Sequence, residues 1–312
     1  MIEQHPTSTA PFRIGSRGSP LALAQAELTM AALEVAHGWP REAMQVIVIT
    51  TSGDRIQDRA LADLGGKALW TKELDRALLA GEIDCAVHSM KDVETIRPEA
   101  IRIVAMLHRA AVEDRLIGAE SIADLREGAI IGTSSPRRAA QLKALRPDLQ
   151  TTLLRGNVAT RIARVAAGNI DATLLAAAGL DRLGRPDVGA TIPVETLLPA
   201  VSQGAVGIEC RADDDRAAML LSAIDDSETS RCVGAERALL LGLGGSCHSP
   251  IAALARVIDN DIHLRAQILS EDGSEQVNDQ ILLPDGDPDG AAELAVRLLD
   301  RASPALRALF TP

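Results

Sequence analysis

A strand, a turn and a helix start recur in the same order at two places in this chain. Ile14 to Pro20 passes from an apolar strand through a Gly-Ser turn to a Ser-Pro pair, and Ile130 to Pro136 repeats that order. Serine is a favoured helix N-cap, and proline suits the first helical position. Gly81 to Val87 and Gly168 to Leu174 form a second matching pair. The recurrence predicts two similar α/β lobes; a chance match between common helix starts is the alternative.

Hydrophobic periodicity and turn residues predict the remaining elements. Val201 to Arg211 is interpreted as a strand that carries the chain back into the first lobe, and a polar, acidic linker is expected from Arg211 to Glu228. In chain order, we further expect a strand at 45–50, a loop at 51–67, a helix at 70–80, a strand at 101–107, a helix at 232–243, strands at 251–257, 262–269 and 276–283, and a helix at 289–300.

These elements predict an α/β fold of two lobes with an active-site cleft between them, followed by a small α+β C-terminal domain. The first lobe is expected at 1–108 and 204–224, the second at 109–203, and the C-terminal domain at 225–312. Open α/β sheets bind ligands beyond the carboxyl ends of their strands. Functional residues are therefore expected at those ends.

Composition excludes several classes of protein. Hydrophobic residues make up 46% and charged residues 24%, as in ordinary globular proteins. A net charge of -11 and only four aromatic side chains argue against nucleic-acid binding. No apolar run is long enough to span a membrane, and the amino terminus lacks the basic-then-apolar layout of a signal peptide, so a cytoplasmic protein is expected. The four cysteines are scattered without a CxxC pair, so neither a metal site nor a disulfide framework is indicated.

A compact group of polar residues follows the apolar strand that begins at Ile83. His88, Ser89, Lys91 and Asp92 arrive within five residues, at the point where the strand is expected to end. A Lys-Asp pair at the carboxyl end of a strand suits a ligand site. A solvated turn with a surface ion pair is the alternative.

Positive charge is concentrated in the second lobe. The stretch from Ile131 to Val165 contains seven basic residues and a single acid, Asp148. Cations in the first turn of a helix oppose the helix macrodipole, and arginine offers paired donors to carboxylates. A small polycarboxylate ligand is therefore expected to bind Arg137, Arg138, Arg155 and Arg161. A solvated basic face is the better interpretation of Lys143, Arg146 and Arg164.

Cys247 lies in a Gly-Gly-Ser-Cys turn next to His248. The two glycines allow a close backbone approach, and a neighbouring histidine can lower the pKa of a thiol. Cys247 is therefore a candidate functional thiol, although an isolated loop cysteine is more often inert.

Over nearly its whole length, the sequence resembles the hydroxymethylbilane synthase (porphobilinogen deaminase) family. Each matching segment is weak evidence alone, but all of them in order, ending in the Gly-Gly-Ser-Cys turn, are highly specific. The segments are Ile14 to Leu23, Leu64 to Lys67, His88 to Val93, Gly132 to Arg138, Leu154 to Val158, Ala178 to Gly184 and Gln203 to Glu209.

The resemblance implies an enzyme that joins four porphobilinogen units head to tail with loss of ammonia and releases a linear tetrapyrrole by hydrolysis. It implies two lobes like those of periplasmic binding proteins, with a dipyrromethane cofactor held by a thioether to Cys247. Asp92 matches the catalytic carboxylate. The implied cofactor-binding residues are Lys91, Ser135, Arg137, Arg138, Arg155 and Gly156, and the implied substrate-binding residues are Arg17, Ser19, Lys67, Arg161, Arg182 and Gln203.

A monomer that passes its product to a downstream tetrapyrrole-cyclising enzyme is expected. Two other classes of protein remain as alternatives. A binding protein for an anionic metabolite would explain the lobes and arginines, but not the Lys91-Asp92 pair or the cysteine turn. A transferase with a sulfur nucleophile would explain Cys247 but leave the arginine array too large for a small acyl group.

Overall fold

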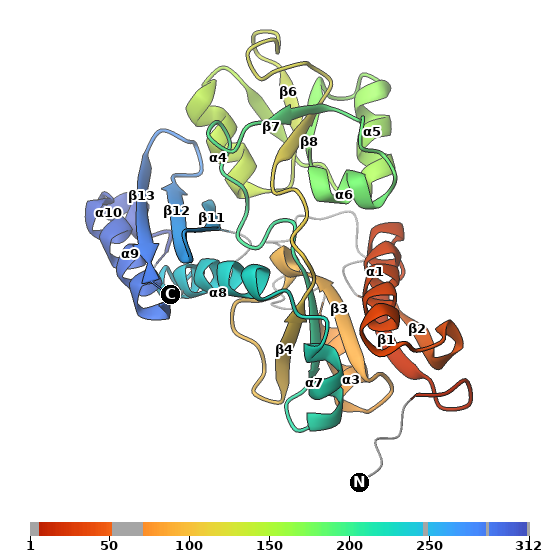
Figure 1. The fold of residues 1–312 in the computed structure, drawn as a ribbon. Helices are drawn as coiled ribbons and strands as arrows, with labels where there is room; N and C mark the ends of the chain where they lie inside the picture. Colours follow the sequence, from red (N-terminus) through yellow and green to blue (C-terminus); the bar gives the residue numbers. More distant parts are fainter. Residues whose placement is uncertain (1–5, 52–70, 246–248, 285–286, 311–312) are drawn as a thin grey trace. The chain divides into compact units, whose positions relative to one another are not determined.

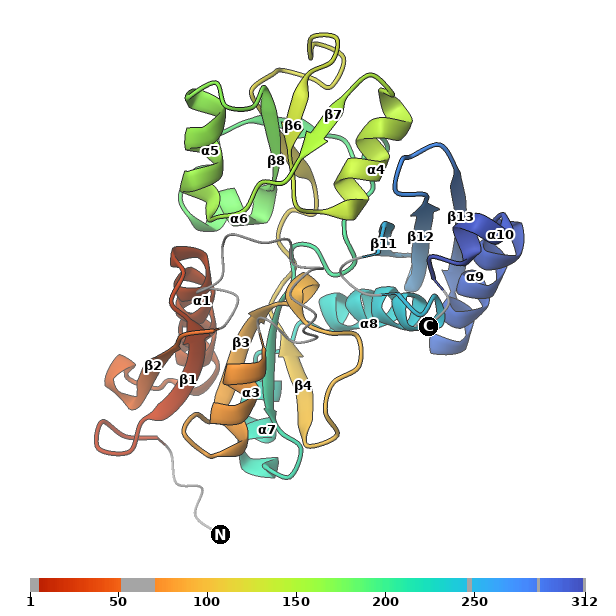
Figure 2. The ribbon, with the colours of Figure 1, turned by 180° about the vertical axis from the view of Figure 1, so that it is seen from behind.

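The computed structural model describes residues 6–51, 71–245, 249–284 and 287–310. The chain divides into two compact units, and Figures 1 and 2 show its helices and strands from opposite sides. The described part of the first unit comprises residues 6–51, 71–109 and 205–230; that of the second comprises 110–204 and the described residues from 231 onward. The three-domain division expected from the sequence stays a prediction.

A five-stranded sheet forms the first unit, in the order β2-β1-β3-β10-β4. β1 pairs in parallel with β2 and β3, whereas β10 runs antiparallel to both of its neighbours. The expected return of the chain into the first lobe is therefore confirmed. The elements are β1 (Phe12–Arg17), α1 (Pro20–His37), η1 (Arg41–Ala43), β2 (Met44–Ile49), α3 (Lys72–Leu79), β3 (Cys85–Ser89), η3 (Met90–Asp92), β4 (Ile101–Met106), β10 (Val206–Arg211) and α7 (Asp215–Ser222).

Helices cover both faces of this first sheet. Side chains alternate across a strand, and β3 shows the result. Cys85 and Val87 share a buried cluster with residues of α1 and α7, whereas Ala86 belongs to the cluster formed with α3. Because β3 is buried on both faces, it is an almost continuous apolar run, as expected for a central strand of an α/β sheet.

The sheet of the second unit repeats this topology, in the order β7-β6-β8-β5-β9. β6 pairs in parallel with β7 and β8, and β5 runs antiparallel between β8 and β9. The prediction of two similar α/β lobes is confirmed. The elements are β5 (Asp114–Ile117), β6 (Ile130–Gly132), α4 (Pro136–Leu145), β7 (Gln150–Thr152), α5 (Val158–Ala166), β8 (Ala172–Ala176), α6 (Ala177–Arg182) and β9 (Ala190–Ile192).

The local signals behind the repeat act as expected. Ser19 and Ser135 are the N-caps of α1 and α4, and each side chain accepts a hydrogen bond from a backbone N–H of the first turn. Gly81 and Gly168 both have a φ of +69°, in the left-handed region where glycine is favoured. The same chemistry therefore starts the helix and introduces the following strand in each lobe.

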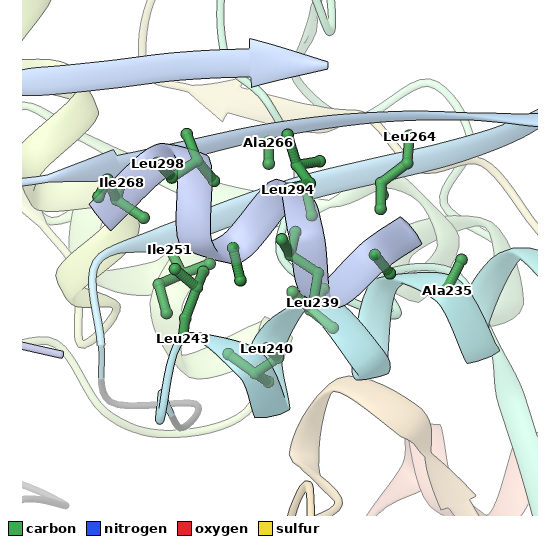
Figure 3. Close-up of a cluster of buried hydrophobic side chains, with 14 of the residues drawn as sticks. Ala235, Leu239, Leu240, Leu243, Ile251, Leu264, Ala266, Ile268, Leu294 and Leu298 are labelled. Atoms are coloured by element: carbon green, nitrogen blue, oxygen red, sulfur yellow. The ribbon is translucent and has the colours of Figure 1, made fainter. Parts of the chain in front are cut away.

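The C-terminal part of the second unit is a three-stranded antiparallel sheet packed against helices. A buried cluster joins the sheet residue Leu264 and its neighbours to Leu239 of α8, to Leu243 directly after that helix, and to Leu294 and Leu298 of α9 (Figure 3). This confirms the small α+β C-terminal domain. The elements are α8 (Ser227–Gly242), β11 (Ile251–Ile258), β12 (Asp261–Leu269), β13 (Gln276–Leu283), α9 (Pro288–Arg301) and α10 (Pro304–Arg307).

The expected linker from Arg211 to Glu228 is wrong. Residues 215–222 form α7, whose N-cap Asp214 accepts a hydrogen bond from the backbone N–H of Ala217. Ala217, Leu220 and Leu221 of this helix are buried. Their spacing is that of a helix face, which the surrounding charges obscured. α8 also begins at Ser227, before the predicted start at residue 232.

Gly204 lies where the chain leaves the second unit, and its backbone requires glycine. Its φ is +87°, and a Cβ there would lie 2.5 Å from the carbonyl oxygen of Ala110. Gly204→Ala is therefore expected to lower the free energy of unfolding by about 1–3 kcal/mol. Chemical denaturation checks this, with Gly234→Ala as the matched control. Gly234 is helical with open space around it, so alanine there should stabilise by about 0.5–1 kcal/mol. A neutral Gly204→Ala would contradict the expected strain.

Candidate functional site

A polar pocket of about 60 Å³ lies at the carboxyl ends of β1 and β3. The two strands are parallel neighbours, so the residues that follow them meet at one edge of the sheet. Arg17 ends β1, and Asp92 ends the short η3 turn after β3. The prediction that Lys91 and Asp92 lie just beyond a strand is confirmed. The pocket lining is Arg17, Ser19, Leu21, Ala22, Gln25, Val87, His88, Ser89 and Asp92.

Hydrogen bonds from α1 hold this pocket in place. The Ser19 hydroxyl accepts a hydrogen bond from the backbone N–H of Ala22 at 3.2 Å, while its own proton remains available as a donor. Buried Gln25 donates from Nε2 to the Ser89 hydroxyl at 2.7 Å. The start of α1 is thereby tied to the end of β3, so Ser19 and Asp92 sit on rigid elements.

A buried network of charged side chains lies behind the pocket. Glu209 on β10 is fully buried, and its Oε2 lies 3.1 Å from Nε2 of the pocket residue His88. Arg97 donates to both Glu209 oxygens, at 2.8 and 2.9 Å, and to Glu94 and Asp75, at 2.8 and 2.5 Å. One arginine therefore joins three carboxylates, and one of them, Glu209, lies on the strand that pairs with β3, the strand that leads to Asp92.

The network perturbs the ionisation of its members. Burial raises the pKa of Glu209, but His88 and Arg97 outweigh burial and lower that pKa to about 2. Burial raises the pKa of Asp75 above its ordinary value against the opposing effect of Arg97. Glu209 is thus held as a carboxylate over the whole physiological pH range.

In the second unit, Asp114 joins the two arginines that begin α4. Arg137 Nη2 donates to Asp114 Oδ2 at 2.8 Å, and Arg138 donates through Nε and Nη2 at 3.1 and 2.6 Å. Gln203 Nε2 donates to Asp114 Oδ1 at 2.9 Å. All four residues are buried. Burial raises the pKa of Asp114, but Arg138 and Arg137 hold it well below its usual range.

The buried Asp114 corrects the expectation that the arginines of this lobe lack a carboxylate partner within the protein. The count of one acid among seven basic residues covered only Ile131 to Val165. Asp114 lies outside that window and reaches Arg137 and Arg138 because β5 pairs antiparallel with β8. The two cations are therefore partly neutralised within the protein. Their role in cofactor binding stays a prediction.

A second basic segment begins α5. Asn157 is its N-cap and accepts a hydrogen bond from the backbone N–H of Thr160 at 2.9 Å. Gly156 has a φ of +108°, and its carbonyl oxygen accepts a hydrogen bond from Arg161 Nε at 2.9 Å. Arg155 is half-buried. The Gly156 turn thus places Arg161 against the loop that carries Arg155. The binding role of this segment stays a prediction.

Arg182 is the last residue of α6 and contacts the segment through which the chain leaves the second unit, which ends at Gly204. Its Nη2 donates to the Gly204 carbonyl oxygen at 2.6 Å. Burial lowers the pKa of Arg182 from its ordinary value, although Asp181 partly opposes that effect. Two predicted substrate-binding residues therefore meet at this segment: Gln203 lies within it, and Arg182 binds the residue that follows Gln203.

Two predicted site residues, Lys67 and Cys247, lie outside the described residues. Within the described ranges, no group of three or more His, Cys, Asp or Glu side chains is arranged to hold a metal ion. None of the helices in that part of the chain is long and apolar enough to cross a membrane.

Sequence reasoning missed the residues that support the site rather than form it. In the first unit, Arg97 and Glu209 are far apart in the chain and meet only in the folded sheet. In the second unit, the same holds for Asp114 and the two arginines that it binds. The sequence offered one signal for the Asp114 pairing. Asp114 is an acid at the start of an apolar strand, in the same lobe as a helix that begins with two arginines.

Fold and site define an α/β protein with two lobes of like topology, a carboxylate pocket in the first and buried arginines in the second. The family model "Porphobilinogen deaminase, dipyromethane cofactor binding domain" matches residues 12–219, and "Porphobilinogen deaminase, C-terminal domain" matches 230–303. The chain belongs to the porphobilinogen deaminase family.

Known proteins agree with this assignment. The porphobilinogen deaminase of Sphingopyxis alaskensis is 57% identical over 97% of this chain and 98% of its own length. That of Paracoccus denitrificans is 49% identical over 96% of this chain and 97% of its own length. A nutrient binding protein from Burkholderia cenocepacia has 16% identity and a TM-score of 0.42, covering 70% of this chain and 93% of its own, a likeness too distant to support a conclusion.

Proposed function

We propose that the chain deaminates porphobilinogen, joins four molecules head to tail on a dipyrromethane cofactor, and releases the linear tetrapyrrole by hydrolysis. The match of residues 12–219 to the family's cofactor-binding domain is the observation that carries this proposal. Membership of the family makes the chain a transferase of tetrapyrrole biosynthesis, with porphobilinogen as its substrate.

Asp92 is assigned the chemical role. Loss of ammonia from porphobilinogen leaves a pyrrolic cation, and a fixed carboxylate in a small pocket stabilises such a charge. The same carboxylate can exchange protons with the pyrrole nitrogen and the leaving amine. Arg17 and Ser19 line the same pocket and suit the carboxylates of the substrate. The remaining proposed substrate-binding residues are Lys67, Arg161, Arg182 and Gln203.

The described residues of the second unit fit a cofactor that bears carboxylates. Two buried guanidinium groups, Arg137 and Arg138, face one carboxylate, Asp114, which leaves an excess of positive charge. When bound, the dipyrromethane would supply the pyrrole carbon to which the first substrate molecule is joined. The residues proposed to hold its acetate and propionate groups are Lys91, Ser135, Arg137, Arg138, Arg155 and Gly156.

Cys247 is proposed as the covalent anchor. The other three cysteines, Cys85, Cys210 and Cys232, are buried. Burial raises the pKa of the Cys85 thiol well above its ordinary value and also raises that of Cys210. A buried thiol of raised pKa is a poor nucleophile. These observations support the choice of Cys247.

Intact mass after denaturation tests the proposed function. The wild-type chain should carry a covalent adduct of two pyrrole units, and Cys247→Ser should carry none and lack activity while keeping its fold. Cys232→Ser, the control, should retain the adduct. An unmodified and inactive wild-type chain that bound a small polycarboxylate reversibly would favour a binding protein. An adduct on Cys247→Ser would move the anchor to another residue.

Several finer assignments belong to this proposal. We infer a cytoplasmic monomer that passes its product to a tetrapyrrole-cyclising enzyme. The proposed domains are 1–108 with 204–224, 109–203, and 225–312, the last carrying the Cys247 loop.

A further inference from the structure

The carboxylate of Asp114 is fully hydrogen-bonded by buried side chains near the predicted binding residues. It is the first residue of β5 and is 1% exposed. Four hydrogen bonds reach it, three from Arg137 and Arg138 and one from Gln203. A carboxylate offers about four acceptor positions, so its capacity is filled.

The partners of Asp114 are not satisfied in the same way. Arg137 Nε is buried and makes no hydrogen bond with the described residues. Its other donors reach Asp114, the Leu198 carbonyl oxygen and the Gln141 side chain. The cluster holds two guanidinium charges against one carboxylate, in the first turn of α4, where cations oppose the helix macrodipole. A second anion would remove both the charge excess and the conflict with the dipole.

We propose that Asp114 is a positioning residue that fixes the guanidinium planes of Arg137 and Arg138 for a carboxylate of the bound cofactor. The inference rests on the proposed function, because it takes the ligand to be the dipyrromethane. Gln203 extends the arrangement: its Nε2 also donates to the Val112 carbonyl oxygen at 2.7 Å. Through Gln203, Asp114 and its two arginines are therefore linked to the chain segments around Val112 and Gln203.

A purely structural role for Asp114 makes a different prediction. If it only balanced charge in the core, its loss would lower stability but leave each folded molecule able to acquire cofactor normally. Asparagine at this position keeps the shape but replaces one acceptor oxygen with an NH2 group, which faces donors. Asp114→Asn therefore tests whether the carboxylate orients the arginines, because the variant still fills the same space.

Covalent adduct formation measures this directly. The full-length chain is prepared without porphobilinogen and then incubated with subsaturating porphobilinogen below the melting temperature of the least stable variant. Intact mass follows the two-pyrrole adduct with time, and circular dichroism verifies folding. Asp114→Asn should slow adduct formation at least about tenfold, as expected when a charge-assisted contact is lost.

Asp171→Asn is the matched control, because Asp171 pairs with Arg126 through two hydrogen bonds in the same lobe, at the solvent-accessible surface. Its rate should stay within about twofold of wild type. An Asp114→Asn rate equally close to wild type would overturn the inference, as would an equal loss in Asp171→Asn. A wild-type chain that never acquired the adduct would instead contradict the proposed function.

Asp114→Glu keeps the test decisive if the asparagine variant does not fold. Glutamate retains the charge but displaces the carboxylate by one methylene. A positioning role predicts a folded protein that still forms the adduct at least about tenfold more slowly. Adduct formation at the wild-type rate would show that charge alone matters and would overturn the inference.

Discussion

Asp92→Asn is expected to reduce single-turnover release of ammonia from porphobilinogen by at least about a hundredfold, since preorganised electrostatic stabilisers are worth about 3–4 kcal/mol. Asparagine keeps the shape of the side chain but removes the negative charge that opposes the pyrrolic cation. The thioether needs no carboxylate once formed. The variant should therefore be folded, carry its cofactor and be nearly inactive.

Ammonia release is measured on protein whose intact mass confirms the cofactor. The control is Asp84→Asn, just before the opposite end of β3. Asp84 binds Arg13 through paired hydrogen bonds, away from the pocket. This variant should lose some stability while its rate stays within about threefold of wild type. If Asp92→Asn were equally active, Asp92 would only position the pyrrole nitrogens, and another group would stabilise the cation.

Arg97→Met is expected to have the largest effect on stability. Removing one partner of a buried ion pair costs about 3–5 kcal/mol, because it leaves an uncompensated charge. Here the fully buried Glu209 would keep only His88, and Glu94 and Asp75 would lose their shared donor. Chemical denaturation at neutral pH measures the loss. Arg102→Met is the control: Arg102 pairs with the exposed Asp215, and its loss should cost less than about 1 kcal/mol.

Acid unfolding gives an independent measurement of the same network. The pKa of Glu209 is about 2 in the folded chain, below an unfolded value of about 4.3. Its stabilisation is therefore complete above the unfolded pKa and is lost as the pH falls toward 2. Without Arg97, the folded pKa should rise, and the chain should unfold at a higher pH. An unchanged acid midpoint in Arg97→Met would show that His88 alone holds Glu209 ionised.

Features that depend on neighbouring residues could be predicted from the sequence. The Ser-Pro helix starts at Ser19 and Ser135 and the glycines at Gly81 and Gly168 act within one turn of the chain. Their chemistry was therefore visible in the repeat. The location of Asp92 beyond β3 followed from the apolar run before it.

Features that depend on strand pairing could not be predicted in this way. Asp114 meets Arg138 only because β5 lies antiparallel beside β8. Arg97 lies in the loop before β4 and meets Glu209 because β4 pairs with β10. α7 was missed for a different reason, since its buried face is short and lies among aspartates. The predicted binding residues could be chosen by type, but the buried carboxylates that pair with arginines become visible only in three dimensions.

The insertion of β10 between β3 and β4 has a consequence for synthesis of the chain. A nascent polypeptide that has emerged through residue 200 contains every strand of the second sheet but lacks the fourth strand in the order of the first. Until β10 emerges, β3 and β4 have unpaired edges that can pair wrongly. The lobe at the amino terminus is therefore the later of the two to complete its sheet on the ribosome.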